Sequence, residues 1–395
     1  MSGAVGNRLR FGVLVSHPIQ YFAPLFRELA ERPEIDLIVI YRTRLGVEAY
    51  HDQGFGQTVQ WDVPLLDGYR HEFLSHKTIL SGFEPKIVKL LLRERFDVLL
   101  VHGYNSVTNL LAMAVAKFVG TKLLLRGDTR LAAHHKTAPA LKRLFKKWLI
   151  RRFDGFVAIG SLNRAYYLEF GAAQDRIFFA PFSVNNADFA LAPEVAAAKR
   201  TETRRSLAIP DDAVVVLYAS KLIALKRPID LVTAFGDLAR EFPKAWLLVA
   251  GSGDEMPRLS ALVSERSIDR VRFIGFQNQQ SLPGLYAACD LFVLPSQGDA
   301  WGLVVNEVMA AGLPVIVTDE VGAAPDLVEG QGTGLIYPCG DVDALRVGLS
   351  AFMSSSERRH QAGENARQII QHWDVDECAK ALVYSALSVA ENGIT

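Results

Sequence analysis

The chain has 395 residues, of which 50% are hydrophobic and 22% charged, and its 43 Lys and Arg balance its 43 Asp and Glu. This length allows two domains with separate cores, and the composition is that of an ordinary globular enzyme. The charge balance gives no global positive field, which argues against a nucleic-acid-binding protein. The cysteines and histidines show neither metal-ligand spacing nor a disulfide framework. No apolar run reaches the roughly 18–20 residues of a membrane span. We therefore expect a cytoplasmic protein without a bound metal.

The first half of the chain alternates apolar runs with amphipathic segments. We predict helices over 21–31 and 106–119, and strands over 11–16, 36–41, 97–102, 122–125 and 156–159. This alternation is typical of a doubly wound, mostly parallel sheet. The stretch 45–80 is rich in Gly, aromatics and His and has no clear period. We interpret it as loops above the strand ends, where substrate-binding residues are usually held.

A second series of strands follows a charged connection over 190–210, in which we predict a short helix. The last helix, over 375–390, is apolar on one face and is expected to pack back on the body. The sequence thus predicts an α/β protein whose two doubly wound, Rossmann-like domains face each other across a cleft. We place the domains at 1–195 and 205–374, followed by the helical segment 375–395. The predicted strands of the second series are 214–218, 245–250, 272–274, 291–294 and 314–318.

The stretch 291–319 reads as a strand, a small-residue turn, a short helix and a second strand. A loop that runs from a strand end into a helix leaves free backbone N–H groups, which favour phosphates. Gly302 lets a ligand approach this backbone closely. Glu307 lies one turn deeper in the helix, and Asp299 lies in the loop before it. This arrangement suits a nucleoside diphosphate, with the amides on its phosphates and a carboxylate on its sugar hydroxyls.

The alternative is that Glu307 is a solvated helix residue and Asp299 an ordinary turn residue. Glu307 is the only charge between Trp301 and Pro314, which weakens that interpretation. Lys221 and Lys226, after the strand 214–218, could neutralise a leaving diphosphate or could simply be a solvated pair.

The motif resembles the signature of the retaining glycosyltransferases of family 4, also called glycosyl transferases group 1. In that signature two glutamates enclose seven residues and a Phe-Gly or Trp-Gly pair. Here Trp301-Gly302 and Glu307 match, and Asp299 takes the place of the first glutamate. The family also places an Arg and a Lys five residues apart after the matching strand, where this chain has Lys221 and Lys226.

The resemblance implies the GT-B fold, with the chain's end crossing back onto the N-terminal domain, and a metal-independent, hexosyltransferase-type reaction that retains anomeric configuration. The donor, a nucleoside-diphosphate sugar, is a substrate, so no cofactor is expected. It implies that Glu307 holds the ribose and that Asp299 contacts the donor sugar. The diphosphate would lie against Lys226, Lys221 and the amides of Trp301, Gly302 and Leu303, and the base against Gly275 and Phe276.

The first domain offers candidate residues on the acceptor side. His17 and Gln20 follow the first strand, and His102 ends a central strand. Each could contact the acceptor or belong to a structural turn. Arg126 and Asp128 follow the next strand and are interpreted as an ion pair, which either orients the acceptor or only stabilises the fold.

The segment 141–153 is predicted to be a basic amphipathic helix. It could lie on an anionic membrane surface, which would place the protein at the inner face of a membrane. Alternatively its apolar face packs on the sheet and its lysines are solvated.

The resemblance predicts sugar transfer to a glycan or lipid-linked acceptor, in bacterial-type synthesis of cell-surface polysaccharide or glycolipid. Two other functions remain open. A nucleotide-sugar 2-epimerase has the same architecture but needs no acceptor. A non-catalytic nucleotide-sugar-binding protein would tolerate the changes at Asp299 and Lys221.

Overall fold

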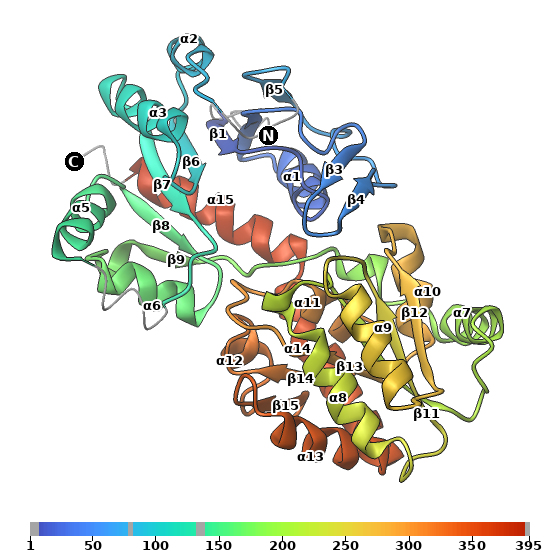
Figure 1. Ribbon diagram of the computed structural model, residues 1–395. Helices are drawn as coiled ribbons and strands as arrows, with labels where there is room; N and C mark the ends of the chain where they lie inside the picture. The colour runs from blue at the N-terminus through green and yellow to red at the C-terminus, as the bar shows by residue number, and fades with distance from the viewer. Residues whose placement is uncertain (1–7, 78–81, 132–138, 392–395) are drawn as a thin grey trace. The chain divides into compact units, whose positions relative to one another are not determined.

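The computed structural model describes residues 8–77, 82–131 and 139–391 (Figure 1). The chain forms two compact units. Unit 1 holds the chain up to Tyr50, the segment Pro64–Val184 and the chain from Asp374, whereas unit 2 holds His51–Val63 and Asn185–Trp373. Each unit is built on its own parallel sheet with helices on both faces, so the predicted α/β class with two doubly wound sheets is confirmed.

The sheet of unit 1 has the order β5-β2-β1-β6-β7-β8-β9, and its neighbouring strands are parallel. Its central strands are buried apolar runs, as expected for a sheet covered on both faces. The strands are β1 (Leu9–Val15), β2 (Ile35–Tyr41), β5 (His71–Phe73), β6 (Val98–His102), β7 (Lys122–Arg126), β8 (Gly155–Ala158) and β9 (Ile177–Phe179).

Successive residues of β1 face opposite cores of unit 1. Leu14 packs in one cluster with residues of α2 (Lys86–Glu94), α3 (Val107–Phe118), α5 (Ala140–Ile150) and α6 (Ser161–Glu169). Val13 packs in the other cluster, beside residues of α1 (Phe22–Ala30) and α15 (Val375–Glu391). The last helix of the chain therefore covers the sheet built by the first half, and Figure 1 shows it in red along these strands.

The sheet of unit 2 has the order β12-β11-β10-β13-β14-β15, again with parallel neighbours. Its strands are β10 (Val214–Ala219), β11 (Ala245–Ala250), β12 (Val271–Gly275), β13 (Leu291–Leu294), β14 (Val315–Thr318) and β15 (Gly334–Tyr337). The α-helices of unit 2 are α7 (Pro193–Ser206), α8 (Pro228–Leu238), α9 (Met256–Glu265), α10 (Leu282–Ala287), α11 (Val304–Ala310), α12 (Ala324–Leu327), α13 (Val342–Met353) and α14 (Ser356–Ile370). Short 3₁₀ turns are η1 (Gln174–Arg176) in unit 1, and η2 (Asn186–Asp188), η3 (Ala224–Lys226), η4 (Gln279–Ser281) and η5 (Gln371–Trp373) in unit 2.

The connection predicted over 190–210 contains α7, which packs on α10 rather than running free. Arg204 of α7 is fully buried and donates to the backbone carbonyls of Ala288 and Ala213 and to the carboxylate of Asp290. Because a buried guanidinium is costly without such partners, these bonds fix α7 to unit 2.

The stretch 45–80, predicted as loops alone, also contains β5 and a hairpin of β3 (Tyr50–Asp52) and β4 (Gln57–Val59). Each of these strands has three residues, too few to show a period in the sequence. No helix within the described ranges is long and apolar enough to cross a membrane.

Candidate functional site

The segment after β13 has the predicted strand, turn, helix and strand. β13 and β14 are parallel neighbours, with Phe292 opposite Val315, and α11 lies between them in the chain. Gly302, just before α11, has a φ of 92°, and a Cβ there would lie 3.2 Å from side-chain atoms of Leu294 and Val321. Glycine therefore allows the chain to turn tightly against the end of β13.

Glu307, in α11, is only 1% exposed, so the interpretation of this residue as solvated is wrong. The hydroxyl of Tyr286 donates a hydrogen bond to its Oε2. A carboxylate is rarely buried without a compensating interaction. Exposure to solvent therefore does not explain why Glu307 is present in an otherwise uncharged segment.

Trp301 fixes the loop in front of α11. It is 2% exposed, its indole Nε1 donates to Oδ1 of Asn306 at 2.8 Å, and its ring stacks on Trp373 at 5.1 Å. Its carbonyl accepts a hydrogen bond from the N–H of Ala323 at 2.9 Å. The loop that carries Asp299 and Gly302 is thus held on both sides of its turn.

Lys226 and Asp299 form an ion pair although they lie far apart in the sequence. Lys226 ends η3, after β10, and Asp299 follows the neighbouring strand β13. The two loops are also joined by a hydrogen bond from the N–H of Gln297 to the carbonyl of Leu225, at 2.8 Å. An ideal Cβ on Gly302 would lie 3.7 Å from Oδ2 of Asp299, so the pair borders the turn that begins α11.

Lys221 is paired with Asp52, a residue for which the sequence pattern predicts no role in the site. Its Nζ lies 2.8 and 3.0 Å from the two carboxylate oxygens. Oδ1 of Asp52 also accepts hydrogen bonds from the backbone N–H groups of Gly54 and Phe55. Burial alone would raise the pKa of Asp52, but the hydrogen bonds from Lys221 and the backbone outweigh it and lower that pKa.

Asp52 belongs to the β3–β4 hairpin, which packs within unit 2. Phe55 meets Phe276 edge to face, with ring centroids 4.8 Å apart, and Trp61 lies 6.1 Å from the same ring. Oγ of Ser252 donates to the carbonyl of Phe55 at 2.8 Å. The hairpin therefore covers Phe276, the candidate base-contacting residue.

The sequence carries one signal for this hairpin. In 52–61, DQGFGQTVQW, an Asp and two glycines within five residues mark a tight turn, and the β-branched Thr58 and Val59 follow it. The signal identifies a turn, but neither the bounds of the two short strands nor the partner on which they pack.

The loops after β10, β11 and β12 lie against one another. Gly251 donates its N–H to the carbonyl of Gly275 at 2.7 Å. An ideal Cβ on Gly251 would lie 1.9 Å from the carbonyl oxygen of Ser220, so only glycine fits there. Gly275, with a φ of 70°, turns the chain into Phe276. The donor-side candidates of unit 2 thus gather at the carboxyl edge of its sheet.

The candidates of unit 1 lie at the carboxyl ends of its own strands. His17 follows β1, and its Nδ1 hydrogen-bonds Oγ of Ser16 at 2.8 Å. Burial lowers the pKa of His17 to about 4, so its imidazole is neutral at pH 7. Gln20, three residues later, is partly buried.

His102 and Arg126 are register partners at the ends of β6 and β7. Burial, and then the charge of Arg126, lower the pKa of His102 to about 3. The predicted ion pair of Arg126 with Asp128 is wrong, because Asp128 is exposed and the two form no salt bridge in the described chain. The guanidinium of Arg126 instead donates to Sγ of Cys378 at 3.4 Å and lies over the ring of Phe182.

Within the residues that the structure describes, no three His, Cys, Asp or Glu side chains gather as metal ligands.

The basic helix predicted over 141–153 is present as α5, and its apolar residues are divided between two faces. Leu149 and Ile150 pack in the core of unit 1. A second stripe is exposed, with Leu141 at 81%, Leu144 at 63%, Phe145 at 53% and Trp148 at 52%. The apolar residues of α5 therefore pack on the sheet only in part, and the rest are exposed, so neither of the two predicted orientations describes the whole helix.

Two of the basic residues of α5 face unit 1 rather than solvent. Arg143 pairs with Glu169 at 2.7 Å, and Nζ of Lys146 lies over the rings of Tyr166 and Phe170. The exposed apolar stripe is consequently not explained by packing within unit 1.

Comparisons with known proteins agree with this geometry. The sequence model of the family described as glycosyl transferases group 1 matches residues 199–369. A D-inositol 3-phosphate glycosyltransferase of Saccharomonospora viridis is 29% identical over 370 residues, which cover 88% of this chain and 75% of the relative.

Solved structures share the fold over nearly the whole chain. A glycosyltransferase from Rickettsia africae superposes with a TM-score of 0.76 at 16% identity, covering 98% of this chain and 100% of that structure. HepE of Anabaena, solved with UDP and glucose, superposes with a TM-score of 0.72 at 18% identity, covering 98% and 99%. The motif around Glu307, the two doubly wound sheets and these matches agree: residues 199–369 match the group 1 glycosyltransferases, and the chain has the GT-B fold.

Proposed function

We propose that this glycosyltransferase moves a sugar from a nucleoside-diphosphate sugar to an acceptor, with retention of anomeric configuration and without a metal ion. The observation that carries the proposal is the buried carboxylate of Glu307 beside a turn that also holds the Lys226–Asp299 pair. A ligand that needs both a carboxylate for its hydroxyls and a cation for its phosphates fits this edge of the sheet. The pathway we propose is cell-surface glycan or glycolipid synthesis.

In this proposal each donor group meets a different part of the site. The ribose hydroxyls donate to Glu307, and the base lies against the loop of Gly275 and Phe276. The diphosphate lies on the N–H groups of Trp301 to Leu303 and on Lys226, with Lys221 contributing charge. A structurally similar protein supports this donor class, since HepE of Anabaena is described in complex with UDP-glucose.

The Lys226–Asp299 pair places a protein cation near the leaving diphosphate and a protein anion near the sugar ring of the proposed donor. The bond from the anomeric carbon to the diphosphate oxygen breaks, a bond to the acceptor hydroxyl oxygen forms, and the hydroxyl proton leaves with the diphosphate. Negative charge grows on the diphosphate near Lys226, and positive charge grows on the sugar ring near Asp299. Stabilising the leaving diphosphate is the largest expected contribution to the rate.

We also propose that α5 contacts a membrane surface that carries anionic lipids. Its exposed stripe of Leu141, Leu144, Phe145 and Trp148 is flanked by cations of the same segment, among them Lys142 and Arg152. Apolar side chains beside lysine and arginine are typical of helices that lie in a membrane interface. A second copy of the same basic helix would bring like charges together, so an anionic lipid surface fits better.

The test is thermal stability of the full chain against UDP-, GDP-, ADP- and dTDP-sugars in the presence of a chelator. A ligand at a hundred times its dissociation constant stabilises the folded state by about 2.7 kcal/mol, which is easily detected. We expect one base class to raise the melting temperature. If no nucleotide does so, the proposed donor site is wrong.

Two other functions make different predictions when turnover of the bound donor is measured. A 2-epimerase would convert the bound donor without an acceptor, and a non-catalytic binding protein would leave it unchanged with every acceptor. We expect donor consumption that depends on an acceptor, with the product linkage read by NMR to establish retention.

A further inference from the structure

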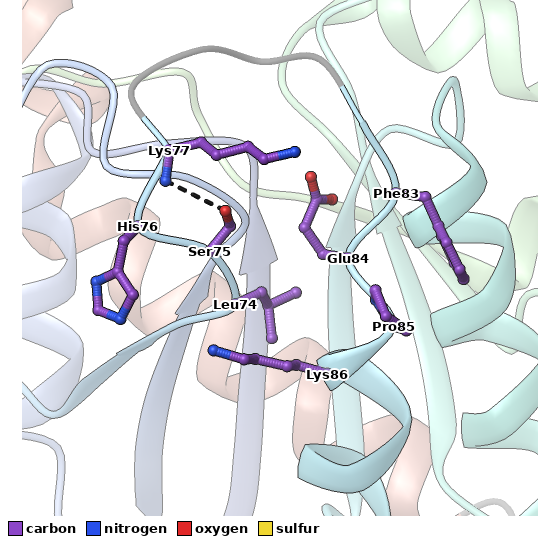
Figure 2. Close-up of a pocket in the computed structure, with 8 residues that line it drawn as sticks. All are labelled: Leu74, Ser75, His76, Lys77, Phe83, Glu84, Pro85 and Lys86. Carbon is purple, nitrogen blue, oxygen red and sulfur yellow. Dashed lines mark hydrogen bonds between the residues drawn. The ribbon is translucent and has the colours of Figure 1, made fainter.

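An open pocket of about 560 Å³ lies at the carboxyl edge of the sheet in unit 1 (Figure 2). One wall is the chain after β5, with Ser75, His76 and Lys77, and the other runs from Phe83 to Lys86, where α2 begins. The N–H of Arg44, after β2, donates to the carbonyl of Lys77 at 2.8 Å. The pocket is thus built from the chain after β5 and the start of α2, and the chain after β2 supports the first of these walls.

The lining of the pocket is positively charged. Lys77 and Lys86 are exposed and form no salt bridge with any residue in the described ranges. Among the described residues of the lining, Glu84 is the one acid, and it is offset by Arg42, whose Nε donates to its Oε2 at 2.9 Å. No side chain caps the first turn of α2 at this wall, so its partial positive charge also favours an anion.

One carboxylate oxygen of Glu84 is buried without a hydrogen-bond donor in the described chain. Glu84 is 4% exposed, and its Oε2 accepts hydrogen bonds from Arg42 and from Oγ1 of Thr108, whereas no group in the described chain donates to its Oε1. A buried acceptor without a donor costs free energy, and a ligand hydroxyl would satisfy it.

The unsatisfied oxygen and a lysine ammonium border the same small space. An ideal Cβ on Gly82 would lie 3.5 Å from Nζ of Lys77 and 3.7 Å from Oε1 of Glu84. Figure 2 shows the two side chains reaching toward each other from opposite walls. A ligand there meets a cation and a hydrogen-bond acceptor within a few ångströms.

We propose that this pocket binds the acceptor through a phosphate next to hydroxyl groups, as in a polyol phosphate or sugar phosphate. The phosphate lies between Lys77 and Lys86, and a neighbouring hydroxyl donates to Oε1 of Glu84. This assignment deepens the proposed function, on which it rests.

Binding to the full chain would be measured by calorimetry, with and without a saturating nucleoside diphosphate, so that ordered binding is not missed. The soluble probes are myo-inositol 1-phosphate, glucose 1-phosphate and glycerol 3-phosphate, with myo-inositol and inorganic phosphate as partial ligands. Vesicles containing phosphatidylinositol provide the same chemistry on a lipid. We expect one of these phosphates to bind at least about tenfold more tightly than either partial ligand.

The matched variants are Lys77→Ala and Lys86→Ala, with Lys89→Ala as the control on the exposed next turn of α2. All three residues are exposed, so the fold is expected to survive each change. We expect each pocket variant to weaken binding about tenfold and the control to bind as the unchanged protein does.

The proposal would be overturned if all three variants bound the phosphate equally well. It would also be overturned if none of the probes bound to the unchanged protein. Inorganic phosphate binding as tightly as the polyol phosphates would overturn the role of Glu84. Nucleotide binding in the same titrations separates this outcome from a failure of the donor proposal, which concerns other residues.

Discussion

The burial of Glu307 decides how its role can be tested. An alanine at this position would leave the hydroxyl of Tyr286 without its acceptor and open a cavity beside α11. Each of these changes costs stability in its own right, so lost activity would not identify a ribose contact. Glutamine has the same volume and still accepts the hydrogen bond from Tyr286.

We expect Glu307→Gln to fold normally and to lower donor affinity at least about tenfold, because hydrogen bonds to a charged acceptor are worth about 1.5–3 kcal/mol. The measurement is the dissociation constant of the nucleoside diphosphate, compared with that of the nucleoside 2′,3′-dideoxy analogue. The unchanged protein is expected to prefer the hydroxylated ligand, and the variant to lose that preference. A variant that keeps the full preference would place the ribose elsewhere.

At the scale of elements, the strands that carry the site were predictable, and the hairpin contact was not. Buried parallel strands are continuous apolar runs, which is why β10, β11 and β13 were placed within about a residue of their observed bounds. β3 and β4 have three residues each and show no such run. The pairing of Asp52 with Lys221 is a tertiary contact, and no local pattern links two residues so far apart.

The hairpin gives a physical reason for the lysine at 221. Its ammonium bonds both oxygens of Asp52 and lies 4.8 Å from the ring centre of Phe55. An ideal Cβ on Gly54 would lie 2.6 Å from Cδ of Lys221, so the turn fits closely around this side chain. The change from the arginine of the family signature is thus matched by residues of a different element. The lone charge at Glu307, by contrast, was visible in the sequence because its neighbours are uncharged.

The exposed stripe of α5 predicts membrane association that depends on two aromatic rings. We expect the double variant Phe145→Ser and Trp148→Ser to reduce co-sedimentation with vesicles rich in phosphatidylglycerol by about tenfold, because roughly 25 cal/mol is lost per Å² of apolar surface no longer buried. Phe118→Ser, at a residue of α3 that is 87% exposed, is the control. Raising the salt should weaken binding of the unchanged protein. Vesicle binding unaltered by the double change would assign the membrane contact to another surface.

At the scale of the whole molecule, the two sheets differ in the side chains at the carboxyl ends of their strands. In unit 2 the ends of β10 and β13 carry paired charges, Lys221 with Asp52 and Lys226 with Asp299. In unit 1 the ends of β1 and β6 carry His17 and His102, which burial keeps neutral. The first arrangement suits a charged ligand, whereas the second links the stability of the fold to pH.

Burial lowers the pKa of His17 to about 4 and, together with the charge of Arg126, that of His102 to about 3. The unfolded chain binds these protons near pH 6.5, so stability is complete above that pH and falls as the pH is lowered toward the folded-state values. Between about pH 7 and pH 5 each histidine should cost roughly 2 kcal/mol, before most carboxylates titrate. Urea unfolding across this range should show the loss, and His102→Gln should remove about half of it. His76→Gln, at an exposed residue of the same unit, is the control. Stability that stays constant down to pH 5 would mean that the folded protein accepts these protons, and that the two strand ends are open to water.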